Sequence, residues 1–288
     1  QLDITLSSEC NLSCSYCCKQ YSSTWRKDIE VNGDYKGLSN HNDRYALNNF
    51  DRVLKKLSQK KRQQTTIADL VNTEIDMMAD GLNSVTMTGG EPLLDHRFSD
   101  MIQKFKNTKS VVVHSGLGVS ETVLRRGLDA MSDTQHKTTL CISAESIGKN
   151  FEFNRQGSNW ETFLRYIDII KEYDVAIQFA STYSNLNITD YVKFNTMFHE
   201  YPISMNMVYD PAFMSVYNLD DETKKQVIND IKQSRLSNSK NANEIINTIN
   251  QPTNEKLRQE LRYFIQEFTR RRKISIDFMP ESFKTWIK

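Results

Sequence analysis

The chain has 288 residues, 38% hydrophobic and 25% charged, which suits one large α/β domain with a substantial core. Its formal net charge of +1 does not favour nucleic acid or a membrane as the main partner, and no apolar run reaches the length of a membrane span. The first residues lack the basic and then apolar pattern of a signal peptide, so we expect a cytoplasmic protein.

The N-terminal segment, residues 2–6, alternates apolar and polar residues, as is typical of a strand. Cys10, Cys14 and Cys17 follow it at the spacing C-x3-C-x2-C. Thiolates this close can converge on one metal centre, and such cysteines hold iron–sulfur clusters. Three ligands would leave one iron of a four-iron cluster open for chemistry. Because four of the five cysteines lie between residues 10 and 18, the pattern favours metal binding in a reducing compartment over disulfides.

Residues 19–44 carry many Ser, Asn and Gly residues without periodicity, which predicts a long connection. Apolar residues then recur at helical spacing, which predicts amphipathic helices over residues 50–57 and 67–78. Residues 55–62 between them are rich in Lys and Arg. No aromatic residue interleaves with this basic run, so we interpret it as a solvated helix face and turn rather than a nucleic-acid patch.

From residue 84 the chain alternates strands and helices. Strands are predicted at residues 84–88, 110–114, 138–143, 175–181 and 203–208, and helices around 98–105, 123–131, 160–170 and 191–197. With the N-terminal strand, this alternation implies a six-stranded parallel sheet with right-handed connections. Six units are too few for a closed eightfold barrel, so we predict an α/β fold with a partial (β/α)6 barrel of the TIM type as the core, over residues 1–210. In such barrels the functional residues gather at the C-terminal ends of the strands.

The pattern changes beyond Pro211, and we predict a mainly helical extension over residues 211–288, packed on the core. Helices are predicted around residues 227–231 and 257–268, with the Ser- and Asn-rich residues 234–250 partly loop and residues 274–278 a short strand. The basic residues 270–273 end the last long helix. Cations there suit the helix dipole, so we prefer a structural role for them over a phosphate site.

Two motifs resemble those of the radical S-adenosylmethionine (radical SAM) superfamily. Cys10, Cys14, Tyr16 and Cys17 resemble its cluster loop, and Thr-Gly-Gly-Glu-Pro at residues 88–92 resembles its GGEP motif. Each motif follows a predicted strand. The resemblance implies a 4Fe–4S cluster on the three cysteines, with S-adenosylmethionine chelating the free iron. It also implies an external one-electron donor such as flavodoxin or ferredoxin.

The resemblance assigns further residues to S-adenosylmethionine. Gly89 and Gly90 lack a Cβ, so the backbone can approach a ligand closely, and we expect it and Glu91 to face the ammonium group. Ser143 and Glu145, spaced by two on an extended chain, point the same way and are expected to bond the ribose hydroxyls, although the family commonly has Ser-x-Asp there. The alternatives are an ordinary strand-to-helix turn for the glycines and a helix cap for Ser143.

Arg155 lies in an Asn-Arg-Gln-Gly sequence similar to the family's Arg-x-Gly segment, in which the guanidinium pairs with the methionyl carboxylate. A surface arginine is the alternative. Tyr16 is expected to pack near the adenine. Polar residues near other strand ends are candidates for lining a substrate cavity, although each alone is more often a satisfied barrel residue: His114, Gln178, Ser181, Asn206 and Tyr209.

Cys18 and Cys141 are interpreted as buried, small apolar residues. No cysteine follows Cys141, so the extension lacks ligands for the auxiliary clusters that many peptide-modifying radical SAM enzymes carry. The extension instead resembles a truncated twitch region without a cluster.

The leading hypothesis is an enzyme that cleaves S-adenosylmethionine reductively to a 5′-deoxyadenosyl radical, which takes hydrogen from a peptide, a nucleoside or another small molecule. A glycyl-radical activating enzyme acting on a protein partner has the same cysteine spacing. The alternative from another class is a zinc-stabilised binding module without catalysis, using Cys18 as the fourth ligand. Adjacent Cys17 and Cys18 would strain the tetrahedral geometry of such a zinc site.

Overall fold

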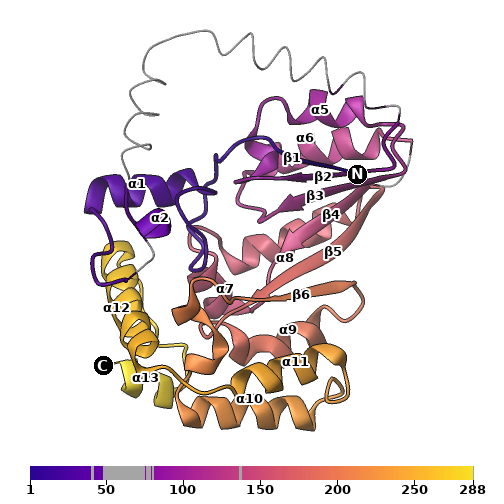
Figure 1. Cartoon of the computed structure of the whole chain (residues 1–288). Helices are drawn as coiled ribbons and strands as arrows, with labels where there is room; N and C mark the ends of the chain where they lie inside the picture. The colour runs from indigo at the N-terminus through magenta and orange to yellow at the C-terminus, as the bar shows by residue number, and fades with distance from the viewer. Residues whose placement is uncertain (40–41, 48–74, 76–78, 80, 136–137, 288) are drawn as a thin grey trace.

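The computed structural model describes residues 1–39, 42–47, 75, 79, 81–135 and 138–287, and a six-stranded sheet forms its centre (Figure 1). The strands are β1 (Leu2–Thr5), β2 (Ser84–Thr88), β3 (Ser110–Ser115), β4 (Thr138–Ser143), β5 (Val175–Tyr183) and β6 (Ile203–Met207). They lie in chain order and every neighbouring pair is parallel. The predicted parallel α/β fold is therefore confirmed, with the sheet open between β1 and β6.

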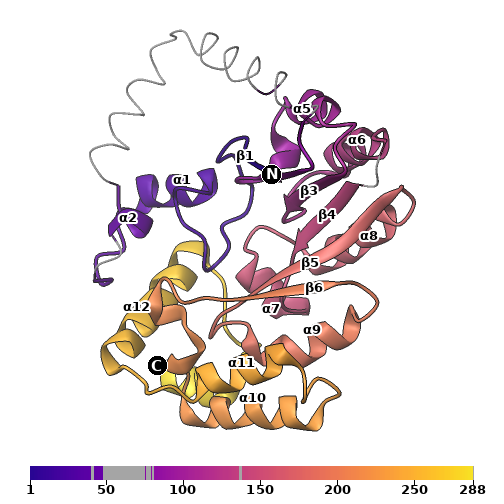
Figure 2. The ribbon, with the colours of Figure 1, turned by 45° about the vertical axis from the view of Figure 1, so that its right-hand side comes forward.

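Helical crossovers join the later strands, as predicted. They are α5 (Phe98–Lys104), α6 (Glu121–Ser132), α8 (Trp160–Ile170) and α9 (Tyr191–Met197). Figure 2 shows these helices along the outer side of the curved sheet, with α1 on the other side. An additional short helix, α7 (Gly148–Asn154), precedes α8 and was not predicted. The single direction of winding is that of a partial barrel.

The prediction of an irregular connection over residues 19–44 is wrong. The segment contains α1 (Ser23–Asn32) and α2 (Asn42–Tyr45). Ser22, one of the serines of this polar segment, is the N-cap of α1, because its side chain accepts a hydrogen bond from the backbone N–H of Trp25. The helices predicted over residues 50–57 and 67–78, and the basic run between them, lie outside the described residues, apart from Ile75.

The C-terminal part is helical, as predicted, and contains α10 (Asp221–Gln233), α11 (Lys240–Ile249), α12 (Glu255–Arg272) and α13 (Glu281–Ile287). Short 3-10 helices lie at Pro92–Leu94, Ile188–Asp190, Ala212–Met214 and Val216–Asn218. Residues 234–250, predicted to be partly loop, are irregular at residues 234–239 and then form α11, with Ser239 as its N-cap. One prediction needs correction here. Residues 274–278 form no strand, since they follow the end of α12 as an irregular segment.

Two hydrophobic clusters stabilise the fold. One lies between the sheet and its outer helices and includes Val113 and Leu140. The other, which we call the Trp25 cluster, joins Trp25 of α1 with Phe264 and Phe268 of α12 and with residues after β5 and β6. This cluster contains residues on both sides of position 210, and the domain boundary there stays a prediction. Within the described residues, no helix has the length and apolarity that crossing a membrane would require.

Candidate active site

The cysteine loop, residues 6–22, connects β1 to α1. The indole Nε1 of Trp25 donates a 2.8 Å hydrogen bond to the carbonyl oxygen of Cys14. Ser15 is bound twice to Asn154 at the end of α7, by its Oγ at 2.7 Å and by its backbone N–H at 2.9 Å. Helix α1 and the end of α7 therefore hold the middle of the loop from two sides.

A cavity of about 270 Å³ lies beside this loop. It receives residues from the C-terminal ends of β2, β3 and β4, where a parallel barrel is expected to carry its functional groups. Among the residues predicted to bind the cluster or S-adenosylmethionine, Glu145 alone does not line it. The predicted residues that do are Cys10, Cys14, Cys17, Tyr16, Gly89, Gly90, Glu91, Ser143 and Arg155.

The three thiols share a buried environment that opposes their ionisation. Burial, and next the charge of Cys14, raise the pKa of Cys10 to about 12. Burial also raises the pKa of Cys14 and of Cys17, and at Cys17 the charge of Cys14 adds to the rise. Thiolates here would repel one another, so the pocket favours them only beside a positive charge.

Gly89 and Gly90 bring β2 against the cysteine loop. The backbone N–H of Gly90 donates to the carbonyl of Ser7 at 2.8 Å, and that of Glu91 donates to the carbonyl of Glu9 at 2.7 Å. A Cβ at Gly90 would overlap the backbone of Glu9, and Gly89 has a φ of +135°, which favours glycine. The glycines were predicted to let the backbone approach a ligand closely. In this structure they let it approach the backbone of the cysteine loop.

Glu91 is buried at the edge of the cavity. Its carboxylate accepts hydrogen bonds from Ser115 Oγ at 2.9 and 3.0 Å and from the backbone N–H of Gly116 at 3.0 Å. Burial raises the pKa of Glu91 to about 7, and the hydrogen bonds oppose only part of that rise. Glu91 thus fixes the segment after β3 to the segment after β2.

Tyr16, Glu145 and Arg155 form one buried group. Arg155 Nη2 contacts the Glu145 carboxylate at 2.6 Å, and the Tyr16 hydroxyl donates to the same carboxylate at 3.1 Å. The guanidinium lies 5.3 Å from the centre of the Tyr16 ring, and its Nη1 is 3.6 Å from Cys14 Sγ. Burial, the largest single effect, would lower the pKa of Arg155, but the charges of Glu145, Tyr16 and Cys14 together with the hydrogen bond to Glu145 hold that pKa above its ordinary range.

This placement differs from the expectation for Glu145. Its side chain is fully buried behind Arg155 and Tyr16 and is hydrogen-bonded to both. Arg155 is likewise no surface arginine, because only 7% of its side chain is exposed. The longer glutamate side chain reaches the guanidinium from the end of β4.

The family comparison adds a decisive observation. Residues 4–190 match the model of the radical SAM superfamily. The chain belongs to the radical SAM superfamily. The match covers the sheet from β1 to β5 with the cysteine loop, and ends before the C-terminal helices. No curated protein matches the chain at a significant level.

Solved structures of the protein SuiB from Streptococcus suis are similar in part. SuiB from Streptococcus suis bound to the precursor peptide SuiA has 15% identity and a TM-score of 0.44, covering 81% of this chain and 46% of that chain. SuiB bound to S-adenosylmethionine has 14% identity and a TM-score of 0.39, covering 72% and 38%. A third SuiB structure has 13% identity and a TM-score of 0.44, covering 81% and 47%. The chain thus corresponds to less than half the length of these structures.

Radical SAM enzymes use a 4Fe–4S cluster and S-adenosylmethionine, and the residues present fit both. Three thiols around one cavity, one buried and two half-buried, suit an iron–sulfur core whose positive charge offsets their repulsion. The Nε of Arg155 is buried without a hydrogen-bond partner in the described chain, which suits a ligand carboxylate. Among the described residues, no three His, Cys, Asp or Glu side chains are grouped to hold a single metal ion.

The cavity beside the cysteine loop is also lined by residues that the sequence analysis did not assign to the site. Of the candidate substrate residues, only His114 lines it, while Ser181 is buried and donates to the Ala144 carbonyl at 2.6 Å. Thr88, Ser115 and Gly116 lie at the C-terminal ends of β2 and β3, a position that could have identified them, whereas Leu12 and Tyr21 belong to the cysteine loop. Cys18 and Cys141 are buried at 2% exposure, which confirms their interpretation.

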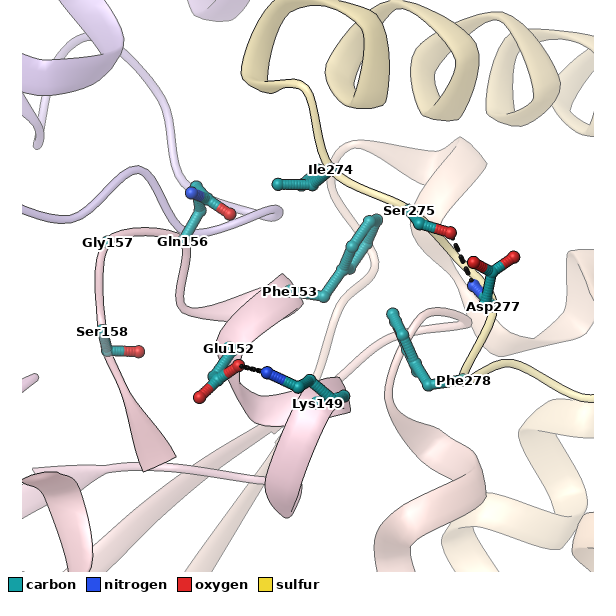
Figure 3. A pocket seen from close by; sticks show the side chains of 10 residues that line it. All are labelled: Lys149, Glu152, Phe153, Gln156, Gly157, Ser158, Ile274, Ser275, Asp277 and Phe278. Atoms are coloured by element: carbon teal, nitrogen blue, oxygen red, sulfur yellow. Dashed lines mark hydrogen bonds and ion pairs between the residues drawn. The ribbon is translucent and has the colours of Figure 1, made fainter. Parts of the chain in front are cut away.

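A second cavity, of about 500 Å³, lies between α7 and the segment after α12 (Figure 3). Its apolar wall includes Phe153 and Phe278, whose ring centres are 5.3 Å apart, and Asp277 lies at its edge. Arg155 lines the first cavity and residues 156–158 line the second, so one short loop separates the two. Although the second cavity is larger, the cysteines lie in the first, and we place the candidate active site there.

Proposed function

We propose that the chain is a radical SAM enzyme in which Cys10, Cys14 and Cys17 hold a 4Fe–4S cluster. When bound, the cluster and S-adenosylmethionine supply a 5′-deoxyadenosyl radical that removes a hydrogen atom from the substrate. The observation that carries the proposal is that all three thiols line one cavity with the glycines after β2, inside the span that matches the superfamily.

Arg155 is proposed to bind the methionyl carboxylate of S-adenosylmethionine. It lines the cavity, has an unpartnered Nε in the described chain and is held by Glu145 at 2.6 Å. A guanidinium fixed in this way offers its remaining N–H groups in a preorganised fork. Tyr16, whose hydroxyl Glu145 also binds, is proposed to pack against the adenine.

Two further groups complete the proposed S-adenosylmethionine site. The carbonyls of Gly89 and Gly90, together with Glu91, are proposed to face the ammonium group, since these residues line the cavity at the end of β2. Ser143 is proposed to bind a ribose hydroxyl from the end of β4. Because these groups come from separate strands, a ligand touching all of them is held across the mouth of the sheet.

The substrate is proposed to be a peptide, a nucleoside or another small molecule that enters beside His114 and Tyr21. Burial lowers the pKa of His114, so at neutral pH its imidazole is uncharged and both donates and accepts a hydrogen bond. Tyr21 is 58% exposed although it lines the cavity, which supports a contact with an incoming molecule. The electron is proposed to come from a donor such as flavodoxin or ferredoxin, in a reducing compartment that suits five unpaired cysteines.

The test is anaerobic reconstitution of the chain with iron and sulfide, followed by strong reductant and S-adenosylmethionine. We expect brown protein with about four irons per chain and formation of 5′-deoxyadenosine. Cys10→Ala, Cys14→Ala and Cys17→Ala should each lose both properties, whereas the matched controls Cys18→Ala and Cys141→Ala should keep them. Colourless protein with one zinc per chain, lost on Cys18→Ala, would instead establish the zinc-stabilised binding module.

A further inference from the structure

The C-terminal helix α12 contacts the cysteine loop directly. Arg272, its last residue, donates a 3.3 Å hydrogen bond from Nε to the hydroxyl of Ser13, which lies between the first two cysteines. Ser13 is only 4% exposed, and within the described chain the Arg272 guanidinium is the hydrogen-bond partner of its hydroxyl. Helix α12 lies outside residues 4–190, so the superfamily match does not include this contact.

The guanidinium of Arg272 contacts two aromatic rings, a hydroxyl and a carboxylate, although its Nη2 makes no hydrogen bond in the described chain. It lies 3.9 Å from the ring centre of Phe268 and 4.5 Å from that of Trp25. Its Nη1 donates to the Tyr35 hydroxyl at 3.0 Å, and its Nη2 lies 3.6 Å from Asp28. Since only 8% of the side chain is exposed, this cation is fixed in position and little screened by water.

Trp25 links Arg272 to Cys14, the next residue of the cysteine loop. Its ring packs against Arg272, while its Nε1 binds the carbonyl of Cys14 at 2.8 Å. Arg272 therefore acts on adjacent loop residues by two routes, directly through Ser13 and through the indole at Cys14. Arg270 on the same helix differs, because it is 65% exposed and its hydrogen bonds in the described chain are to Glu267.

We propose that Arg272 is a positioning residue that clamps the cysteine loop and places a fixed positive charge beside it. The inference rests on the proposed cluster site, and it adds a residue from the C-terminal part to that site. Hydrogen bonds and charges around ligating cysteines tune the affinity and the reduction potential of iron–sulfur centres. A buried guanidinium there stabilises the extra negative charge that reduction brings, so it raises the midpoint potential.

The experiment compares reconstituted wild type with Arg272→Gln, Arg272→Lys and Ser13→Ala, using Arg270→Gln as the matched loss of charge on the same helix. Iron release to a chelator and the midpoint potential, followed by electron paramagnetic resonance, are measured. Arg272→Gln should lose iron about 10–100-fold faster and have a more negative midpoint potential. Arg270→Gln should match wild type in both.

The two conservative variants separate the clamp from the charge. Arg272→Lys keeps the charge but not the planar fork, so we expect a potential near that of wild type with iron release intermediate between wild type and Arg272→Gln. Ser13→Ala removes only the hydrogen bond between Arg272 and the loop. The rate of iron release should therefore rise, while the midpoint potential should stay at the wild-type value. If Arg272 had only a structural role, the midpoint potential of Arg272→Gln and the rate of iron release from Ser13→Ala would both equal those of wild type.

The proposal is overturned if Arg272→Gln folds and releases iron at the wild-type rate with the wild-type potential. If Arg272→Gln does not fold, Ser13→Ala decides, because it leaves the packing of α1 on α12 unchanged; wild-type iron release in that variant overturns the proposal. If the wild type itself binds no iron, the proposed function fails separately. The clamp is then tested on the free chain by alkylation of Cys14, which Ser13→Ala should accelerate; an unchanged alkylation rate counts against the clamp.

Discussion

Replacing Glu91 by glutamine should remove a pH dependence of stability that the buried carboxyl group creates. Burial raises the pKa of Glu91 from 4.5 to about 7 in the folded chain. The unfolded chain therefore ionises this group first as the pH rises. The favourable contribution of Glu91 is complete below the unfolded pKa of 4.5 and is lost progressively up to the folded pKa of about 7.

The size of this effect follows from the shift. Each unit of pKa difference corresponds to about 1.4 kcal/mol, so the total loss is about 3 kcal/mol, of which roughly 2–3 kcal/mol falls between pH 5 and pH 8. Glu91 is buried at 1% exposure, so solvent screening does not reduce this figure. Between pH 5 and pH 8 the free energy of unfolding of Glu91→Gln should therefore fall by roughly 2–3 kcal/mol less than that of wild type.

The assay is urea unfolding of the iron-free chain at several pH values between 5 and 8, followed by circular dichroism. The matched control is Glu244→Gln, which removes a carboxylate from the exposed face of α11 and should keep the wild-type pH profile. Comparison of slopes is necessary because the amide in Glu91→Gln also loses a hydrogen bond from a backbone N–H, which shifts stability equally at every pH. A Glu91→Gln profile as steep as that of wild type would refute the reasoning from burial.

Three further variants test the contacts around the cysteine loop. Gly90→Ala should lower the free energy of unfolding by about 1–3 kcal/mol, because its Cβ would overlap loop backbone, whereas Gly116→Ala meets only a side-chain end, and thermal unfolding compares them. Arg155→Met should cost about 3–5 kcal/mol in urea unfolding by leaving Glu145 charged and unpaired, and adding Glu145→Leu should recover most of it. Trp25→Phe should cost about 1–3 kcal/mol through the lost indole hydrogen bond; an unchanged urea midpoint would show that this bond contributes nothing.

The sheet and the position of the site followed from local patterns in the chain. Apolar runs separated by amphipathic helices predict parallel strands, and Cys10 and Gly89 each follow such a run. The strands' C-terminal ends therefore bring both motifs to one cavity, as the structure has them. These inferences succeed because each depends on residues that are neighbours in the sequence.

The failures concern residues whose role is set by a distant partner. Ser22 belongs to a polar, aperiodic segment, and only the packing of Trp25 against α12 shows that a helix begins there. The alternation at residues 274–278 predicted a strand, but these apolar side chains pack on the Trp25 cluster without a strand to pair with. Glu145 has the spacing of a ligand-facing residue, yet Arg155 draws its carboxylate into the interior.

The Trp25 cluster also orders events during synthesis of the protein. The bond from Arg272 to Ser13 spans 259 positions, so the ribosome must complete α12 before the N-terminal thiols acquire their final surroundings. Until then a nascent chain carries three thiols in a loop without its aromatic support, open to oxidation or to the wrong metal. If these thiols hold a cluster, as proposed, the finished surroundings of the cluster form only after α12 has been synthesised and has packed on α1.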